Sequence, residues 1–272
     1  MKRYAVLVCI IAVALALVTG SIAYFTDTVE SNDNVIAAGN LDIVLHETER
    51  KMDADGKFTA ELQTYSQHKA IYPSTINGEI LKNAENRIAV EGVAAPLYNG
   101  PAAGFVDKIV TVENDGSLMA AIRTLIAVPA AYDQQDQLIP WLHMDRLEDE
   151  TVWAWEGPYR GEIDGSNYAV YAATYQQPLQ PDQVTPPSLL GFYMDGKVNN
   201  NDHAYTYKAE DGTEYELMDI DQDIDIRVFV EAAQGNPDVF ATPLEALNTT
   251  FGVIAETENE VMVLKHNPWV KK

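Results

Sequence analysis

The pattern of hydrophobic and polar positions predicts strands along most of the chain. Residues 106–112 and 120–128 are apolar runs on either side of a turn that contains Gly116, so we expect them to pair as a hairpin. Residues 220–230 alternate between apolar and polar, which is typical of a strand with one face in a core and one in water. Further short strands are expected at 41–45, 168–171, 192–198, 205–207 and 214–218.

Turn residues separate these short strands at regular intervals. Asp-Gly pairs at 195–196 and 211–212 suit two more tight hairpins. Many short strands with turns between them indicate an all-β fold, which we expect to be a jelly-roll-like antiparallel β-sandwich with short helices. One sandwich domain over 37–272 is expected, with two large insertions at about 46–104 and 129–187, where the pattern is irregular.

One short helix is well marked near the C-terminus. Thr242 can cap its start, Pro243 suits the first helical position, and Glu245 completes a Thr-x-x-Glu capping box. Gly252 suits the stop because glycine tolerates the left-handed conformation common at helix ends. The sequence therefore predicts a helix between these residues.

The start of the chain has the pattern of an export signal. Two basic residues precede the uncharged apolar run 4–18, and Ser21 and Ala23 follow with the small-x-small spacing that a signal peptidase requires. We expect residues 1–23 to be a signal-peptide helix that is cleaved between Ala23 and Tyr24, leaving a secreted protein. The alternative is an uncleaved membrane anchor, although the run is shorter than a comfortable bilayer span.

Charge and cysteine content narrow the function classes. The whole chain has a formal charge of −23, and because Lys2 and Arg3 precede the cleavage point, residues 24–272 carry −25. Such a surface repels nucleic acid and anionic lipid, so we expect no nucleic-acid partner and membrane contact only through an uncleaved signal peptide. Cys9 is the single cysteine, so the mature chain has no disulfide and no thiol chemistry.

Three segments resemble a known family. The first is Ala23-Tyr24-Phe25-Thr26-Asp27 with the strand at 34–43 that contains Ala38-Gly39-Asn40-Leu41-Asp42. The second is the turn Val112-Glu113-Asn114-Asp115-Gly116-Ser117-Leu118, and the third is the late strand Val228-Phe229-Val230-Glu231-Ala232-Ala233-Gln234. In this order they resemble the TasA/camelysin family. The resemblance covers about a third of the chain and does not extend to the two insertions.

The resemblance implies a structural role. It implies a secreted jelly-roll subunit of extracellular biofilm-matrix fibres, processed by a SipW-type signal peptidase, whose partners are copies of itself and a fibre anchor or accessory protein. Fibres would form by donor-strand complementation, with residues 24–36 as the donor segment. Its apolar plugs would be Tyr24, Phe25, Val29, Val35 and Ile36. The alternative is that this segment is a flexible terminus.

Other chemistries are less well supported by the sequence. A camelysin-like metallopeptidase would need two histidines one helical turn apart, and none of the five histidines (His46, His68, His143, His203, His266) has that spacing. We therefore expect no enzyme activity, no catalytic or metal site and no cofactor. Asp219, Asp221, Asp223 and Asp225 recur like early calcium ligands, but the loop lacks the glycine and the final glutamate, which favours a solvated strand face.

A carbohydrate-binding module is the main alternative function. Jelly rolls also serve as lectins, and an aromatic-rich stretch could provide a stacking surface for sugars. Packing in a core is the competing interpretation, because aromatic side chains bury large areas. The residues concerned are Trp141, Trp153, Trp155, Tyr159, Tyr168, Tyr171 and Tyr175.

Overall fold

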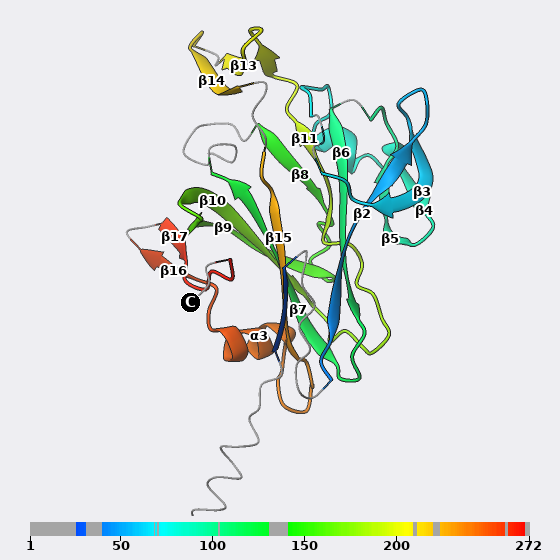
Figure 1. The fold of residues 1–272 in the computed structure, drawn as a ribbon, viewed down its shortest axis with the longest axis vertical. Helices are drawn as coiled ribbons and strands as arrows, with labels where there is room; N and C mark the ends of the chain where they lie inside the picture. Colours follow the sequence, from blue (N-terminus) through cyan, green and yellow to red (C-terminus); the bar gives the residue numbers. More distant parts are fainter. Residues whose placement is uncertain are drawn as a thin grey trace, which may run out of the picture.

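Two main sheets face each other as a sandwich, and smaller sheets and helices are attached around them (Figure 1). This computed structural model describes residues 26–30, 40–67, 69, 71–102, 104–130, 141–208, 211–219, 224–258 and 261–269. The expected all-β sandwich is confirmed. The expected signal-peptide helix at 1–23 lies outside the described residues.

The larger sheet has seven strands, which pair antiparallel except for one parallel contact between its β17 and β9 strands. In spatial order they are β1 (Thr26–Glu30), β15 (Arg227–Gln234), β7 (Ala120–Pro129), β10 (Ser166–Tyr175), β9 (Trp153–Ile163), β17 (Val261–Leu264) and β16 (Ala255–Glu258). The first-listed strand, β1, therefore lies at one edge of this sheet.

The second main sheet has five strands, and two small sheets accompany it. Its strands in spatial order are β3 (Phe58–Thr64), β2 (Ile43–Met52), β6 (Phe105–Asn114), β11 (Leu189–Met194) and β8 (Leu142–Arg146). The small sheets are β12 (Val198–Asn200) with β13 (Ala204–Lys208) and β14 (Glu214–Asp219), and β4 (Arg87–Val90) with β5 (Val93–Tyr98). The helical elements are α2 (Gly78–Lys82), η1 (Ala84–Asn86) and α3 (Pro243–Phe251).

The interior between the main sheets is built by alternate residues of their central strands. Ile122 of β7 and Val230 of β15 belong to the interior cluster and are fully buried. Leu125 and Phe229, which lie on the opposite face of the same two strands, belong to another apolar cluster on the outer face of the seven-stranded sheet. Helix α3 and the C-terminal strap (residues 254–258 and 261–269) pack on that outer face. As a result, β7 and β15 are buried on both faces.

The expectation that residues 106–112 pair with 120–128 is wrong, because β6 and β7 lie in different sheets. Asn114 Nδ2 donates hydrogen bonds to the backbone oxygens of Leu118 at 2.8 Å and Leu179 at 2.9 Å. A Cβ on Gly116 would lie only 2.4 Å from the backbone oxygen of Asn40. These contacts hold the turn against neighbouring loops, so the chain passes to the other sheet instead of folding back.

One of the two expected Asp-Gly hairpins is confirmed. β13 and β14 pair antiparallel across the turn that contains Gly212, whose φ is 87°. The hairpin expected at 195–196 is wrong, because β12 pairs with β13 and not with β11. A Cβ on Gly196 would lie 2.2 Å from the backbone oxygen of Ser74. This turn is therefore packed tightly against another loop.

The strand expected at 220–230 is confirmed from Arg227, where β15 begins, and is wrong at 224–226, which form no strand; residues 220–223 lie outside the described part of the chain. Ile224 still packs against a second buried apolar cluster, which contains Ile126 and Val228, but it lies outside any strand. The Asp225 carboxylate accepts hydrogen bonds from Tyr168 Oη at 3.1 Å and from Arg227 Nε at 2.9 Å. The alternating pattern alone predicted a continuous strand here. In the structure the residues just before β15 make side-chain contacts and form no strand.

Helix α3 has the caps that the sequence predicts. The Thr242 hydroxyl accepts a hydrogen bond from the Glu245 backbone nitrogen at 3.1 Å, and Gly252 follows the last turn with a φ of 86°. The Glu245 carboxylate accepts from the backbone nitrogen of Ala241 at 2.8 Å. Ala246 and Leu247 then pack on the outer face of the seven-stranded sheet, which fixes the helix on that face.

The two expected insertions differ in the structure. Residues 46–104 contain most of β2 and all of β3, which are strands of the five-stranded sheet, and then α2, η1, β4 and β5, which pack on the outer face of that sheet. Residues 129–187 supply β8, β9 and β10 to the two main sheets. That second stretch is therefore integral to the sandwich.

Candidate assembly edge

The N-terminal strand β1 pairs with one neighbour alone among the described strands. Its five residues run antiparallel to β15, with Thr26 opposite Ala233 and Glu30 opposite Phe229. In the strand order it lies next to β15, on the side away from β7, and Figure 1 shows it as a short dark-blue strand at the lower end of β15. We call the β1-facing side of β15 the assembly edge, because its backbone groups would lack strand partners if β1 left.

The structure places part of the expected donor segment at this edge. Val29 lies directly opposite Val230, which has no exposed surface. The other expected plugs, Tyr24, Phe25, Val35 and Ile36, lie outside the described residues, as does the cleavage site between Ala23 and Tyr24. In the single chain the described part of the segment, residues 26–30, thus forms an edge strand of the chain's own seven-stranded sheet.

The rest of β15 is firmly built into the sandwich. All eight of its residues pair with β7, from Arg227 opposite Ala127 to Gln234 opposite Ala120. Six of its residues, Val228 to Ala233, are buried. The strand is therefore fixed on both faces and along one edge, and only the pairing with β1 depends on a short, separate segment.

An ion pair lies on the outer face of β15, next to the assembly edge. Glu231 is fully buried and lies opposite Thr28 on one side and opposite Arg123 on the other. The Arg123 guanidinium donates from Nε to the Glu231 carboxylate at 2.6 Å, and from Nη1 to Asn248 of α3 at 3.1 Å. His266 Nε2 of the C-terminal strap lies 2.6 Å from the same carboxylate.

Sequence reasoning missed this cluster, although a signal was present. Arg123 is the one charged residue in the mostly apolar run from Ala120 to Val128, and a fully buried arginine requires a charged or polar partner. The partner Glu231 is far away in sequence, so its identity depends on which strands are neighbours. The sequence therefore indicates that Arg123 needs a partner but does not indicate which residue it is.

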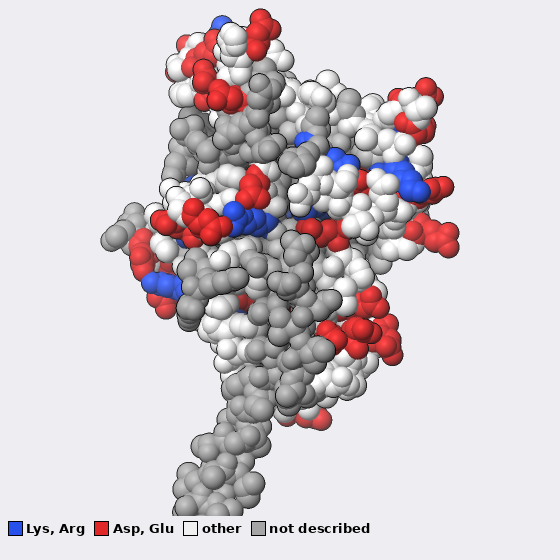
Figure 2. Space-filling model, viewed as in Figure 1, with Lys and Arg blue, Asp and Glu red and all other residues white. Residues whose placement is uncertain are grey.

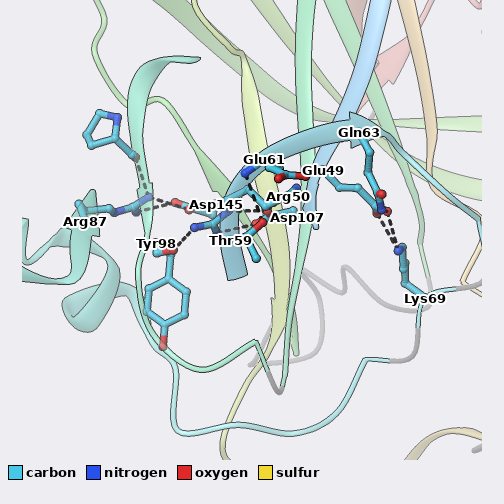
Figure 3. Close-up of polar contacts among 11 residues, drawn as sticks. Glu49, Arg50, Thr59, Glu61, Gln63, Lys69, Arg87, Tyr98, Asp107 and Asp145 are labelled. Carbon is cyan, nitrogen blue, oxygen red and sulfur yellow. Dashed lines mark hydrogen bonds and ion pairs between the residues drawn. The ribbon is translucent and has the colours of Figure 1, made fainter. Parts of the chain in front are cut away.

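A second group of polar contacts and ion pairs fastens β4 and β5 to the five-stranded sheet (Figure 3). Arg50 binds Asp107 with two nitrogens, at 2.7 and 2.8 Å, and donates to the Tyr98 backbone oxygen at 2.7 Å. Arg87 of β4 likewise donates two hydrogen bonds to the Asp145 carboxylate of β8, from Nη1 at 2.8 Å and from Nη2 at 2.7 Å. Burial raises the pKa of Asp145, against the lowering effect of the Arg87 hydrogen bonds. The described part of the chain contains no cysteine that could form a disulfide, and these contacts hold its segments together instead.

The aromatic residues considered for sugar binding are used largely for packing. Trp153 is fully buried and Trp141, Tyr159 and Tyr168 are 2–4% exposed. Trp155 packs against the interior cluster, and its indole nitrogen donates to the Leu147 backbone oxygen at 3.1 Å. The burial of these rings supports the core-packing interpretation, so the sandwich does not present them together as a stacking platform.

The described residues contain no group of three or more histidine, cysteine, aspartate or glutamate side chains placed to hold a metal ion. His46 pairs with Glu113 at 2.8 Å and His143 with Asp195 at 3.2 Å. Of the acidic series considered for calcium, Asp219 ends β14 and Asp225 is bound as described above, whereas Asp221 and Asp223 lie outside the described residues, as does His68. His203 is exposed on the loop before β13.

A shallow depression lies between the start of α2 and the turn after β11. It has a volume of about 570 Å³ and is lined by Asn77, Glu79, Lys82, Asp195 and Lys197 among others. Its charged groups are of both signs, and Asn77 is already engaged as the cap of α2 through the Ile80 backbone nitrogen at 2.9 Å. The depression therefore has no polar group that points to a particular ligand.

Comparisons place no relative beside this chain. Among the residues that the structure describes, no helix has the length and apolar character needed to cross a bilayer. No family model matches the sequence, and neither the curated proteins nor the solved structures contain a match to it.

Proposed function

We propose that this chain is a secreted structural subunit of an extracellular biofilm-matrix or surface fibre, assembling head-to-tail by donor-strand complementation. The observation that carries the proposal is the position of β1, a five-residue strand that pairs with β15 alone at a sheet edge. The resemblance of three segments along the chain to the TasA/camelysin family points in the same direction. In this proposal the chain has no enzymatic role.

Strand exchange is favoured by the chemistry of this edge. Without β1, the backbone N–H and C=O groups of β15 that face it lose their partners, which is costly in a largely buried strand. The same segment from another copy restores the same pairs, so exchange conserves the contacts. Residues 31–42 link β1 to β2 in the sequence, so in this proposal they would span the distance between the two subunits.

The geometry of such a contact leads to a filament. The donor segment and the assembly edge are different surfaces, so each subunit offers one of each and the contact does not close on itself. Relative to a subunit whose β1 has left its own edge, each link would regain the backbone hydrogen bonds and the burial of the apolar plugs. A fully buried large apolar side chain is worth about 1.5–3 kcal/mol before association entropy is subtracted.

The remaining parts of the proposal follow from export and charge. Cleavage by a SipW-type signal peptidase would free Tyr24 and the donor segment, and the partners would be further copies of the chain and a fibre anchor or accessory protein. The face in Figure 2 carries more carboxylates than basic groups, in keeping with the net charge of −23. An acidic surface of this kind disfavours nucleic acid as a partner.

Electron microscopy of the purified chain from residue 24 onward tests the proposal. We expect filaments from the intact protein, whereas a variant that lacks residues 24–33 should keep a β-rich circular dichroism spectrum and form none. Normal filaments from the truncated protein would refute donor-strand assembly.

Two matched double variants distinguish the loss of strand pairing from the mere change of side chains at the same positions. Because successive N–H groups of a strand point to opposite edges, Thr28→Pro with Val29→Pro removes one donor toward β15 whichever residue supplies it. Thr28→Ser with Val29→Thr keeps both donors and the strand preference. Elongation should stop in the first variant and continue in the second.

A further inference from the structure

The C-terminal strap lies across the outer face of the same sheet. Its Trp269 ring meets Phe229 of β15 edge-on, with ring centroids 5.8 Å apart. Leu264 packs closely on the backbone of β9, where a Cβ on Gly161 would lie 3.0 Å from it. Asn267 Nδ2 donates to the Glu162 backbone oxygen at 2.7 Å. The strap therefore covers β15 from outside and is anchored on β9.

One charged contact joins the strap directly to β15. His266 Nε2 lies 2.6 Å from Glu231 Oε1, with 24% of the histidine side chain exposed and none of the glutamate side chain. Arg123 Nη2 approaches the other carboxylate oxygen at 2.5 Å. Glu231 is thus held between a permanently charged guanidinium on β7 and an ionisable ring on the strap.

The geometry makes this contact depend on the charge of the ring. His266 Nε2 and Glu231 Oε1 are close enough for an ion pair, yet both atoms are buried and neither makes a hydrogen bond of acceptable angle. His46, by contrast, makes a hydrogen bond with Glu113. A contact without hydrogen-bond geometry is attractive mainly through Coulomb interaction, which is strongest for the protonated imidazolium and much weaker for the neutral ring.

The other groups around the contact are accounted for. The Phe251 ring of α3 packs on His266 with centroids 5.5 Å apart, and Asn248 of α3 is neutral and bound to Arg123. The neighbouring Lys265 is paired with Glu256 and Glu258 on β16. On β9, Tyr159 lies close enough to the charges of Glu156 and Arg123 to interact with both of them electrostatically. Only His266 among these groups is of a type that changes charge between pH 5 and 8.

We propose that the C-terminal strap is a pH-sensitive latch on β15, closed by protonated His266 on Glu231 and loosened when His266 loses its proton. Because the imidazolium stabilises the closed strap, the latch is tight in mild acid and weakens as pH rises toward 8. The latch is a property of the single subunit.

The latch acts on the strand that carries the assembly edge. Glu231 lies opposite Thr28 of β1. The residue that His266 of the strap contacts is therefore also one of the five β15 residues that pair with β1. A loosened strap leaves β15 less rigid while β1 exchanges. This role in assembly rests on the proposed function, and we expect strand exchange to be faster at pH 8 than at pH 6.

Hydrogen–deuterium exchange of the monomeric protein tests the latch directly. After correction for the intrinsic pH dependence of amide exchange, strap amides should be about fivefold or more better protected at pH 6 than at pH 8. His266→Gln should abolish this difference. His203→Gln, which changes an exposed histidine on a distant loop, should retain it. Equal protection of the wild-type strap at both pH values, or an unchanged difference in His266→Gln, would overturn the latch.

The assembly role has its own readout. The rate of filament elongation is measured at both pH values for the wild-type protein and for His266→Gln, and we expect pH to alter it only in the wild type. Elongation independent of pH, together with pH-dependent protection, would refute the role in assembly but leave the latch. Absence of filaments at every pH would refute the proposed function and this role, while the exchange measurement on the monomer still decides whether the latch exists. If His266→Gln fails to fold, the wild-type exchange profile decides the latch.

Discussion

Arg123 and Glu231 face each other on neighbouring strands, and neither side chain has any exposed surface. The pair lies where β7, β15, α3 and the C-terminal strap meet, with Asn248 and His266 as its further contacts. Removing two charges from water is expensive, and their mutual attraction recovers that cost only when the geometry is good. The pair is therefore a point at which single and double substitutions should behave very differently.

We predict that Arg123→Met or Glu231→Gln alone lowers the free energy of unfolding by about 3–5 kcal/mol, because each leaves a buried charge uncompensated. The double variant Arg123→Met with Glu231→Met should lose much less, since no unpaired charge remains. Urea denaturation of the three variants measures this. A double variant as unstable as the sum of the two single ones would show that the charges do not act as a pair.

From the Arg87–Asp145 contact, we predict that the loss of stability caused by removing Arg87 depends on pH. Burial raises the pKa of Asp145 above its usual 3.8, and Arg87 opposes that shift. A carboxyl group with a raised pKa in the folded state contributes stability that is complete below its unfolded pKa and is lost as pH rises through the folded one. Arg87→Gln removes the opposing effect, so it should cost about 3 kcal/mol at pH 7 and clearly less near pH 4, where Asp145 can be protonated.

Urea midpoints of Arg87→Gln across pH 4 to 7 check this prediction. Lys82→Gln is the control, because its 3.5 Å contact with Glu148 is exposed and should contribute little at any pH. A cost for Arg87→Gln that stays constant over this range would mean that Asp145 keeps its proton or its charge throughout.

Removal of divalent ions should change thermal stability only slightly. Asp225 is already bound by Tyr168 and Arg227, and the described residues contain no cluster of metal ligands. Thermal melts with and without a chelator measure the difference. A large drop in melting temperature would reveal a calcium site in the acidic stretch from Asp219 to Asp225.

Local signals were sufficient for several elements. The caps of α3 involve residues within a few positions of one another, so Thr242, Glu245 and Gly252 could be assigned from sequence. The β13–β14 hairpin depends on the turn that contains Gly212 in the same way. The inward positions of Val228 and Val230 followed from the two-residue period of a strand.

Long-range pairing accounts for the features that the sequence did not reveal. A short turn between two apolar runs fits a hairpin, but it fits a crossing between sheets equally well, and the crossing at Gly116 is decided by packing on Asn40. The partners of Arg50, Arg87 and Arg123 lie 57, 58 and 108 positions away, so no local pattern could identify them. The pairing of β1 with β15 is a contact of the same kind.

A cysteine pair distinguishes pairing within a chain from pairing between chains. Val29 and Val230 lie directly opposite each other, and opposite residues of an antiparallel pair have Cα atoms about 4.5–5.5 Å apart, within the range of a disulfide. Residues 24–272 contain no cysteine, so Val29→Cys with Val230→Cys introduces the only two thiols.

Oxidation of this variant before and after assembly, followed by non-reducing electrophoresis, is the most direct measurement. If β1 passes between subunits, oxidised filaments should give a ladder of covalently linked chains that collapses to one band on reduction. The variant oxidised as a monomer should stay a single chain and be unable to elongate until it is reduced. Filaments that yield only single chains, each with its own internal disulfide, would contradict donor-strand assembly.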